Sequence, residues 1–159
     1  MYTKSEDTST YSRFFESIKT RVGPIAAKTF MSDMAGAMFN AWASVMPKVE
    51  NHLYCAWHCS RAIRMKLTSL LGKKNDNYSL IKGLFYQLRA ETDIKKFEEK
   101  LMFFRKNFDI LKISENDKQN LINYFENHWL TPEKIPLWAY HCRLNSGINT
   151  NMALERLHR

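Results

Sequence analysis

The chain has 159 residues, of which 45% are hydrophobic and 13% aromatic, so its composition excludes a disordered polymer and is sufficient for a domain with a real core. Its 24 Lys and Arg against 16 Asp and Glu give a net charge of +8, which favours a polyanionic partner such as nucleic acid or an acidic membrane surface. Three cysteines do not predict a disulfide framework, and no apolar run is long enough for a signal or membrane segment. We therefore expect a soluble intracellular protein without a membrane partner.

The first third of the chain predicts alternating helices and strands. Apolar residues recur at helical or strand spacing in four segments, which are Ser9–Val22 (helix), Ala26–Ser32 (strand), Met34–Met46 (helix) and Val49–Tyr54 (strand). Gly23-Pro24 and Pro47 interrupt the two helical patterns. A strand, a helix and a second strand in this order predict a right-handed parallel crossover.

The rest of the chain predicts helices and no further strands. Helical spacing is found in Ala56–Leu71, Ser79–Ala90, Asp93–Asn107 and a segment that opens at Ser114 and includes Phe125. Thr131-Pro132-Glu133 predicts another helix with Pro132 at its first position, and a last helix is expected to begin near Asn149 or Thr150. Gly72–Asn77 is the best linker candidate. We therefore predict an α/β part over residues 8–71, a helical part over 78–140 and a C-terminal helix over 147–159, with helices dominating overall.

Asp33 follows the first predicted strand directly. Open α/β sheets place ligand and metal groups at the carboxyl ends of their strands, because the strand fixes the backbone while the side chain projects into a crevice. Asp33 is therefore a candidate metal ligand. The alternative is that Asp33 caps the helix expected to begin at Met34.

Cys55 and His58 follow the second predicted strand with Cys-x2-His spacing, which can bring a thiolate and an imidazole to one metal ion. Zinc prefers four ligands, and the distant candidates are scattered, so we expect structural packing under Trp57 rather than bound zinc. A nucleophilic Cys-His pair lacks a third orienting residue.

Basic residues follow this motif along the next predicted helix. Arg61, Arg64 and Lys66, with Lys73 and Lys74 beyond them, can form a face that neutralises DNA phosphates, although a solvated helix surface would have the same pattern. Farther along the chain, Trp129, Trp138 and Tyr140 could stack on bases, but aromatic residues at helical spacing usually belong to a core.

Glu155 lies in the predicted C-terminal helix. The segment Asn149-Thr150-Asn151-Met152-Ala153-Leu154-Glu155 puts polar residues ahead of this carboxylate. Taken alone, this segment is an ordinary capped helix with an exposed acidic residue.

In their order along the chain, these segments resemble the catalytic domain of Mutator-like element transposases. The phrases that carry the resemblance are Phe30-Met31-Ser32-Asp33, Ala41-Trp42, Leu53-Tyr54-Cys55-Ala56-Trp57-His58 and Asn149 to Glu155, and the likeness covers about Phe14 to Arg159. It implies a partial ribonuclease-H-like fold with a large helical insertion before the final Glu. It also implies DNA as the partner, the nucleus as the location and DNA transposition as the ancestral process.

The resemblance assigns roles to two carboxylates. Asp33 corresponds to the second Asp of the family's Asp-Asp-Glu triad and Glu155 to its Glu, so both would hold Mg²⁺ or Mn²⁺ for strand cleavage and transfer. The first Asp has no match, and Glu6, Asp7 and Glu16 do not lie on a strand. We therefore expect a transposase-like protein or fragment that is inactive alone.

Two other expectations follow. The first is a non-catalytic, domesticated DNA-binding or regulatory protein that keeps the basic surface, and the second is a helical protein-interaction module over residues 78–140. A partial sheet would also expose a strand edge, so either marginal stability or self-association into a homo-oligomer is expected.

Overall fold

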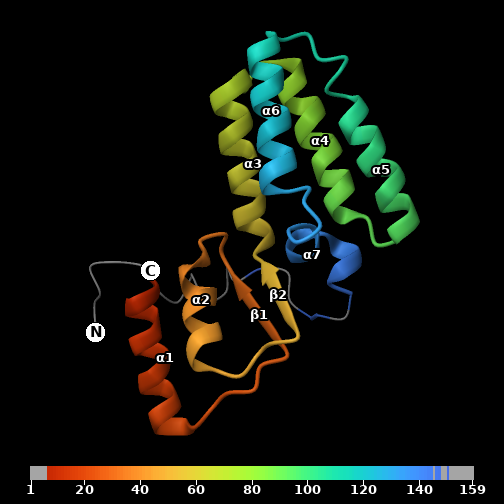
Figure 1. The fold of residues 1–159 in the computed structure, drawn as a ribbon. Coiled ribbons are helices and arrows are strands. Elements are labelled where there is room, and N and C mark those ends of the chain that lie inside the picture. The colour runs from red at the N-terminus through yellow and green to blue at the C-terminus, as the bar shows by residue number, and fades with distance from the viewer. Residues whose placement is uncertain (1–6, 145, 148–149, 151–159) are drawn as a thin grey trace. The chain divides into compact units, whose positions relative to one another are not determined.

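The computed structural model describes residues 7–144, 146, 147 and 150, and these residues form seven α-helices, one 3-10 helix and two strands (Figure 1). The predicted helix-dominated α/β class is confirmed. Within the described part, the chain divides into an α/β unit, residues 7–58 with Thr150, and a helical unit, Cys59–Gly147. The division falls inside helix α3 (Ala56–Leu71) and not in Gly72–Asn77, where the linker was predicted. The apolar face of α3 explains this placement, because Cys59, Ile63 and Leu67 are fully buried in the helical unit.

Helix α1 (Thr8–Val22) has clear local signals at both ends. The Asp7 carboxylate accepts a hydrogen bond from the Thr10 N–H at 2.8 Å, which satisfies one of the free donors of the first turn. At the other end Gly23 adopts a φ of 82°, a conformation that few residues other than glycine adopt at low cost. These two residues fix the limits of α1 close to those predicted from the sequence.

The α/β unit contains the predicted strand, helix and strand. Strand β1 (Thr29–Ser32) pairs in parallel with β2 (Asn51–Tyr54), with Thr29 opposite Asn51 and Ser32 opposite Tyr54. Helix α2 (Gly36–Val45) connects them. Both strands are shorter than predicted, because pairing begins only where the Glu50 and Asn51 N–H groups donate to the Lys28 carbonyl.

Aromatic side chains fill the core of the α/β unit. Phe15 of α1 meets Trp42 of α2 edge to face, with 5.3 Å between ring centroids, and Phe30 of β1 lies 5.0 Å from the same indole. Phe15 and Trp42 are each only 7% exposed, and Ala41, Met46 and Val49 are buried beside them. This cluster holds α1 and α2 together on one side of the two strands.

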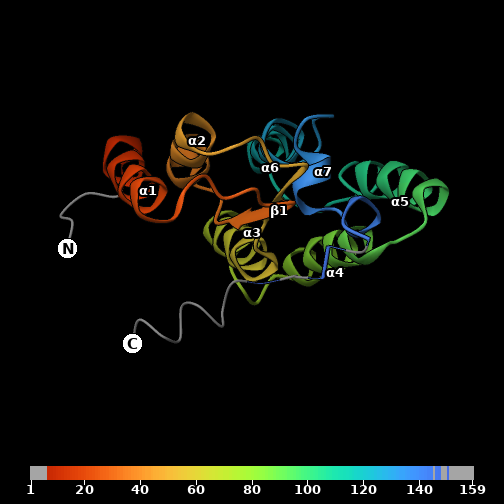
Figure 2. The same ribbon diagram turned by 90° about the horizontal axis from the view of Figure 1, so that it is seen from below.

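The helical unit is an assembly of α-helices that lie side by side (Figure 1), seen nearly end-on in Figure 2. After α3 come α4 (Asp76–Ala90), α5 (Ile94–Lys106), α6 (Glu115–His128), the one-turn helix α7 (Ile135–Trp138) and the 3-10 helix η1 (Tyr140–Cys142). Side chains cap three of them, because Asn75, Asp93 and Ser114 accept from N–H groups at the starts of α4, α5 and α6. No strand occurs among the described residues after Tyr54, as predicted.

Phe85 is the centre of the core of the helical unit. Its ring centroid lies 5.0 to 6.1 Å from those of Phe104, Phe125, Trp129 and Trp138. Both tryptophans are fully buried, and the Trp138 indole N–H donates to the Trp129 carbonyl at 2.8 Å. The core interpretation of these two tryptophans is therefore confirmed, while Tyr140 is half-buried.

The Thr131-Pro132-Glu133 segment differs from its prediction. It forms a turn, in which the Lys134 and Ile135 N–H groups donate to the Thr131 carbonyl, and α7 begins only at Ile135. Pro136 occupies the first turn of that helix. A proline therefore marks the start of a helix, as predicted, but it is Pro136 and not Pro132. None of the helices in the described part is long and apolar enough to cross a membrane.

Candidate nucleic-acid interface

Asp33 lies directly after β1, as predicted. Its Oδ1 atom accepts a hydrogen bond from the Ala35 N–H at 3.0 Å, and it borders a small cavity of about 20 Å³ that Tyr11 and Met38 also line. Helix α2 begins at Gly36, two residues later than predicted, and its N-cap residue Ala35 has no side-chain cap. Asp33 therefore stabilises the turn that precedes α2 and does not cap its first turn.

Cys55 and His58 lie at the start of α3 but make different contacts. The Cys55 Sγ atom is fully buried and lies 3.4 Å from the Thr150 Oγ1 atom, whereas the His58 ring packs edge to face against Trp57 with centroids 4.8 Å apart. Among the described residues, no three His, Cys, Asp or Glu side chains are grouped closely enough to hold a metal ion. Glu155 and the rest of the predicted C-terminal helix, apart from Gly147 and Thr150, lie outside the described residues.

The structure gives His52 of β2 a packing role. Its ring stacks on Phe39, with centroids 3.6 Å apart and planes inclined by 7°, and its Nε2 atom lies 2.8 Å from the buried Ser32 Oγ atom. The Ser32 hydroxyl also donates to the Asp33 carbonyl at 2.7 Å. Since that hydroxyl has one proton, the imidazole N–H donates to Ser32, and the pair links β1 to β2.

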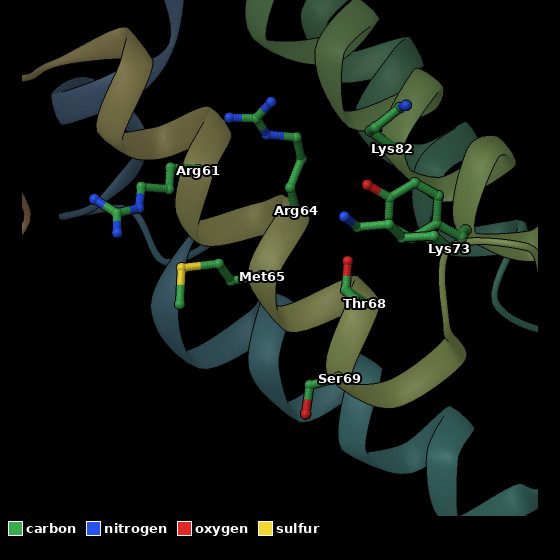
Figure 3. Close-up of a pocket in the computed structure, with 8 residues that line it drawn as sticks. Arg61, Arg64, Met65, Thr68, Ser69, Lys73 and Lys82 are labelled. Atoms are coloured by element: carbon green, nitrogen blue, oxygen red, sulfur yellow. The ribbon is translucent and has the colours of Figure 1, made fainter.

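A concavity of about 670 Å³ lies in the helical unit, between α3 and α4. Four cationic side chains line this α3/α4 groove, which are Arg61, Arg64, Lys73 and Lys82. Figure 3 shows that Arg64 and Thr68 of α3, Lys73 of the turn and Lys82 of α4 surround the space between the helices, while Arg61 and Met65 project from α3 away from α4. Two helices and the turn between them thus supply cations to one site.

The charge of the groove is not balanced by nearby acids in the sequence. From Asn51 to Ala90 there are seven Lys and Arg residues and one acidic residue, Asp76. In the part of the chain that the structure describes, no ion pair involves Arg64, Lys73 or Lys82. A concave surface lined by cations attracts anions, because its low-dielectric walls concentrate the electric field of those charges.

The structure separates the predicted DNA-binding residues into two sets. Arg61 and Arg64 line the groove, but the Lys66 ammonium lies 5.4 Å from the centroid of the Tyr124 ring on α6 and is half-buried. Lys82 was missed in the sequence because it belongs to a different predicted helix. Its spacing of four residues from Tyr78 could have indicated that both side chains share one face of α4, where the Lys82 ammonium lies 5.1 Å from the Tyr78 ring centroid.

No family model matches the chain, and comparisons with curated proteins and with solved structures gave no match. The candidate interface is therefore defined by its own charges and geometry.

Proposed function

We propose that this chain is a DNA-binding protein derived from the catalytic domain of a Mutator-like element transposase, and that the α3/α4 groove contacts the DNA backbone. The observation that carries the proposal is the concentration of Arg61, Arg64, Lys73 and Lys82 around one concavity, where the last three form no ion pair with an acidic residue of the described part of the chain. Lys and Arg that neutralise phosphates release condensed counterions, and this release supplies most of non-specific DNA affinity.

The side chains of the groove are suited to phosphate contact. Arg64 can donate two parallel hydrogen bonds to one phosphate, while Lys73 and Lys82 act as point charges. The hydroxyl groups of Thr68 and Ser69 add neutral donors at the same surface. A contact to the phosphate backbone does not itself read the base sequence.

Metal-dependent strand cleavage is a separate proposal that rests on the resemblance and on the position of Asp33. In a ribonuclease-H-like fold, Asp33 and Glu155 would hold Mg²⁺ or Mn²⁺, which activates the attacking oxygen at a phosphodiester. Asp33 is the single carboxylate beside the 20 Å³ cavity among the described residues, and that is too few oxygen ligands for a hard divalent cation. Asp33 is thus proposed as one ligand of an ancestral site, and no catalytic step is derived from it.

The salt dependence of DNA binding tests the groove. Fluorescence anisotropy with a duplex of arbitrary sequence, between about 50 and about 200 mM salt, should give an affinity that falls steeply as salt rises. Affinity should depend less steeply on salt in the triple variant Arg64→Gln, Lys73→Gln and Lys82→Gln. The negative slope of log K against log salt should become smaller in magnitude by about one per lost phosphate contact. Lys112→Gln is the matched control, because Lys112 is exposed in the loop after α5 and does not line the groove.

Two outcomes would count against the proposal. The first is the absence of salt-dependent binding, and the second is a triple variant with the slope of the unmodified chain. A plasmid-nicking assay with Mg²⁺ or Mn²⁺ tests cleavage independently. Nicking that is lost in Asp33→Asn would show that the chain keeps a working metal site, whereas an absence of nicking is the result expected for a chain that is inactive alone.

A further inference from the structure

The α3/α4 groove is small for a nucleic-acid duplex. Its volume of about 670 Å³ lies within the range of about 300 to 1,000 Å³ that is usual for sites of small molecules. A duplex backbone would lie across the rim of such a hollow, whereas a single projecting group can enter it. The volume therefore admits the end of a strand, with a terminal nucleotide and its phosphate, as the occupant of the groove.

The cations of the groove come from three segments. Arg64 comes from α3, Lys73 from the turn and Lys82 from α4, and Figure 3 places the three around the space between the helices, with the Thr68 hydroxyl beside them. An internal phosphodiester carries one negative charge, but a terminal phosphomonoester carries about −1.5 to −2 at pH 7 and has three acceptor oxygens. The charge of three cations around one hollow is therefore better matched by a terminal phosphomonoester than by an internal phosphodiester.

Among the described residues, the lining of the groove offers no stacking platform. Tyr78 is the aromatic side chain that lines it, but this residue is only 7% exposed, and the Lys82 ammonium lies over its ring at 5.1 Å from the centroid. Recognition by stacking needs an accessible ring face. The groove is thus equipped to recognise phosphate and not a base.

From these observations we infer that the α3/α4 groove is a site for the terminal phosphomonoester of a nucleic-acid strand, so that the chain prefers phosphorylated strand ends to internal backbone. The inference rests on the proposed function and narrows it to the ends of strands. Arg64, Lys73 and Lys82 neutralise the dianion, and Thr68 donates to one of its oxygens. The preference is independent of base sequence.

The test compares three oligonucleotides of one sequence and about ten nucleotides, a length within the usual site size for single strands. One carries a 5′-phosphate, one a 3′-phosphate and one hydroxyl groups at both ends, and anisotropy gives the affinity of the full chain for each. We expect roughly tenfold tighter binding of at least one phosphorylated strand, because a hydrogen-bonded charge adds one strong contact. The two phosphorylated probes distinguish the two ends.

Variants and pH connect that preference to the groove. Lys73→Gln with Lys82→Gln should remove the preference, Arg64→Gln alone should reduce it, and Lys112→Gln should retain it, with circular dichroism showing that each variant is folded. The preference should also weaken as the pH falls below about 6, where the phosphomonoester becomes a monoanion.

Equal affinity for all three oligonucleotides would overturn the inference, and so would a preference that survives in the folded Lys73→Gln, Lys82→Gln variant. Failure of the inference remains distinguishable from failure of the proposed function. Salt-dependent binding of all probes, weakened in the triple variant, would leave DNA binding in place and reject only the preference for ends. The absence of binding to every probe and to duplex DNA would reject both.

Discussion

Two adjacent phenylalanines on α5 give a direct test of the core of the helical unit. Phe104 is 1% exposed, and its ring meets those of Phe108 and Phe125 edge to face at centroid distances of 5.1 and 5.0 Å, whereas Phe103 is 58% exposed. Phe104→Ala should reduce the free energy of unfolding by about 3 to 5 kcal/mol, since it removes buried apolar surface and leaves a cavity. Phe103→Ala should change it by no more than about 0.5 kcal/mol.

The comparison is matched because both changes replace the same residue in the same helix. The gain in helix propensity from Phe to Ala is the same at both positions and cancels in the difference. Urea unfolding of the full chain, followed by circular dichroism, measures the free energies. With a slope of about 2 kcal/mol per molar, the two midpoints should differ by about 1.5 to 2.5 M. Equal midpoints would refute the assignment of Phe104 to the core and of Phe103 to the surface.

Two further predictions concern charged groups. Lys66→Gln should leave DNA affinity within about twofold of the unmodified chain because Lys66 does not line the groove and its ammonium lies over Tyr124 on α6, whereas Arg64→Gln should weaken binding about tenfold. Equal losses in anisotropy measurements would contradict the placement of Lys66. The hydrogen bond from Lys100 lowers the pKa of Glu91 from 4.5 to about 2, so the associated stability is fully present above pH 4.5 and is lost as the pH falls through about 2. Glu91→Gln should therefore flatten the rise of the urea midpoint from pH 2 to pH 4.5, and an unchanged pH profile would exclude this contribution.

Periodicity was sufficient to predict most of the fold. The spacing of Ile81, Leu84, Phe85 and Leu88 predicted α4, and three of these four residues are fully buried. The limits of α1 were predictable because Asp7 and the Gly23-Pro24 pair are strong local signals. Local sequence determines such elements, so they can be read without knowledge of the partners against which they pack.

The starts of short elements could not be predicted in the same way. Pro132 and Pro136 are both compatible with the first turn of a helix, and the choice between them depends on where Trp138 can be buried. The boundary between the two units inside α3 depends likewise on which residues of that helix are covered by other helices. These are tertiary effects, and periodicity within one segment does not report them.

The residues that line the candidate groove could be identified only from the structure, for a similar reason. Sequence reasoning grouped Arg61, Arg64 and Lys66 because they are close in the chain, but a helix turns by about 100° per residue, so neighbours in sequence face different directions. Lys66 consequently lies against Tyr124 on α6, and Lys82 from the next helix lines the groove instead. Charge density was visible in the sequence, whereas the set of cations that share one concavity was not.

The groove and Asp33 belong to different units of the chain. DNA binding by the groove and metal binding by Asp33 should therefore depend on different residues and respond differently to removal of metal ions. The side chains around the groove lie between Arg61 and Lys82 in the helical unit, while Asp33 follows β1 in the α/β unit. Cationic side chains bind phosphate without a metal ion, but carboxylates need a divalent cation to act on a phosphodiester. DNA affinity that persists in a chelator and in Asp33→Asn would therefore assign binding to the groove alone. Affinity that requires Mg²⁺ and Asp33 would instead place the DNA contact at the carboxylate.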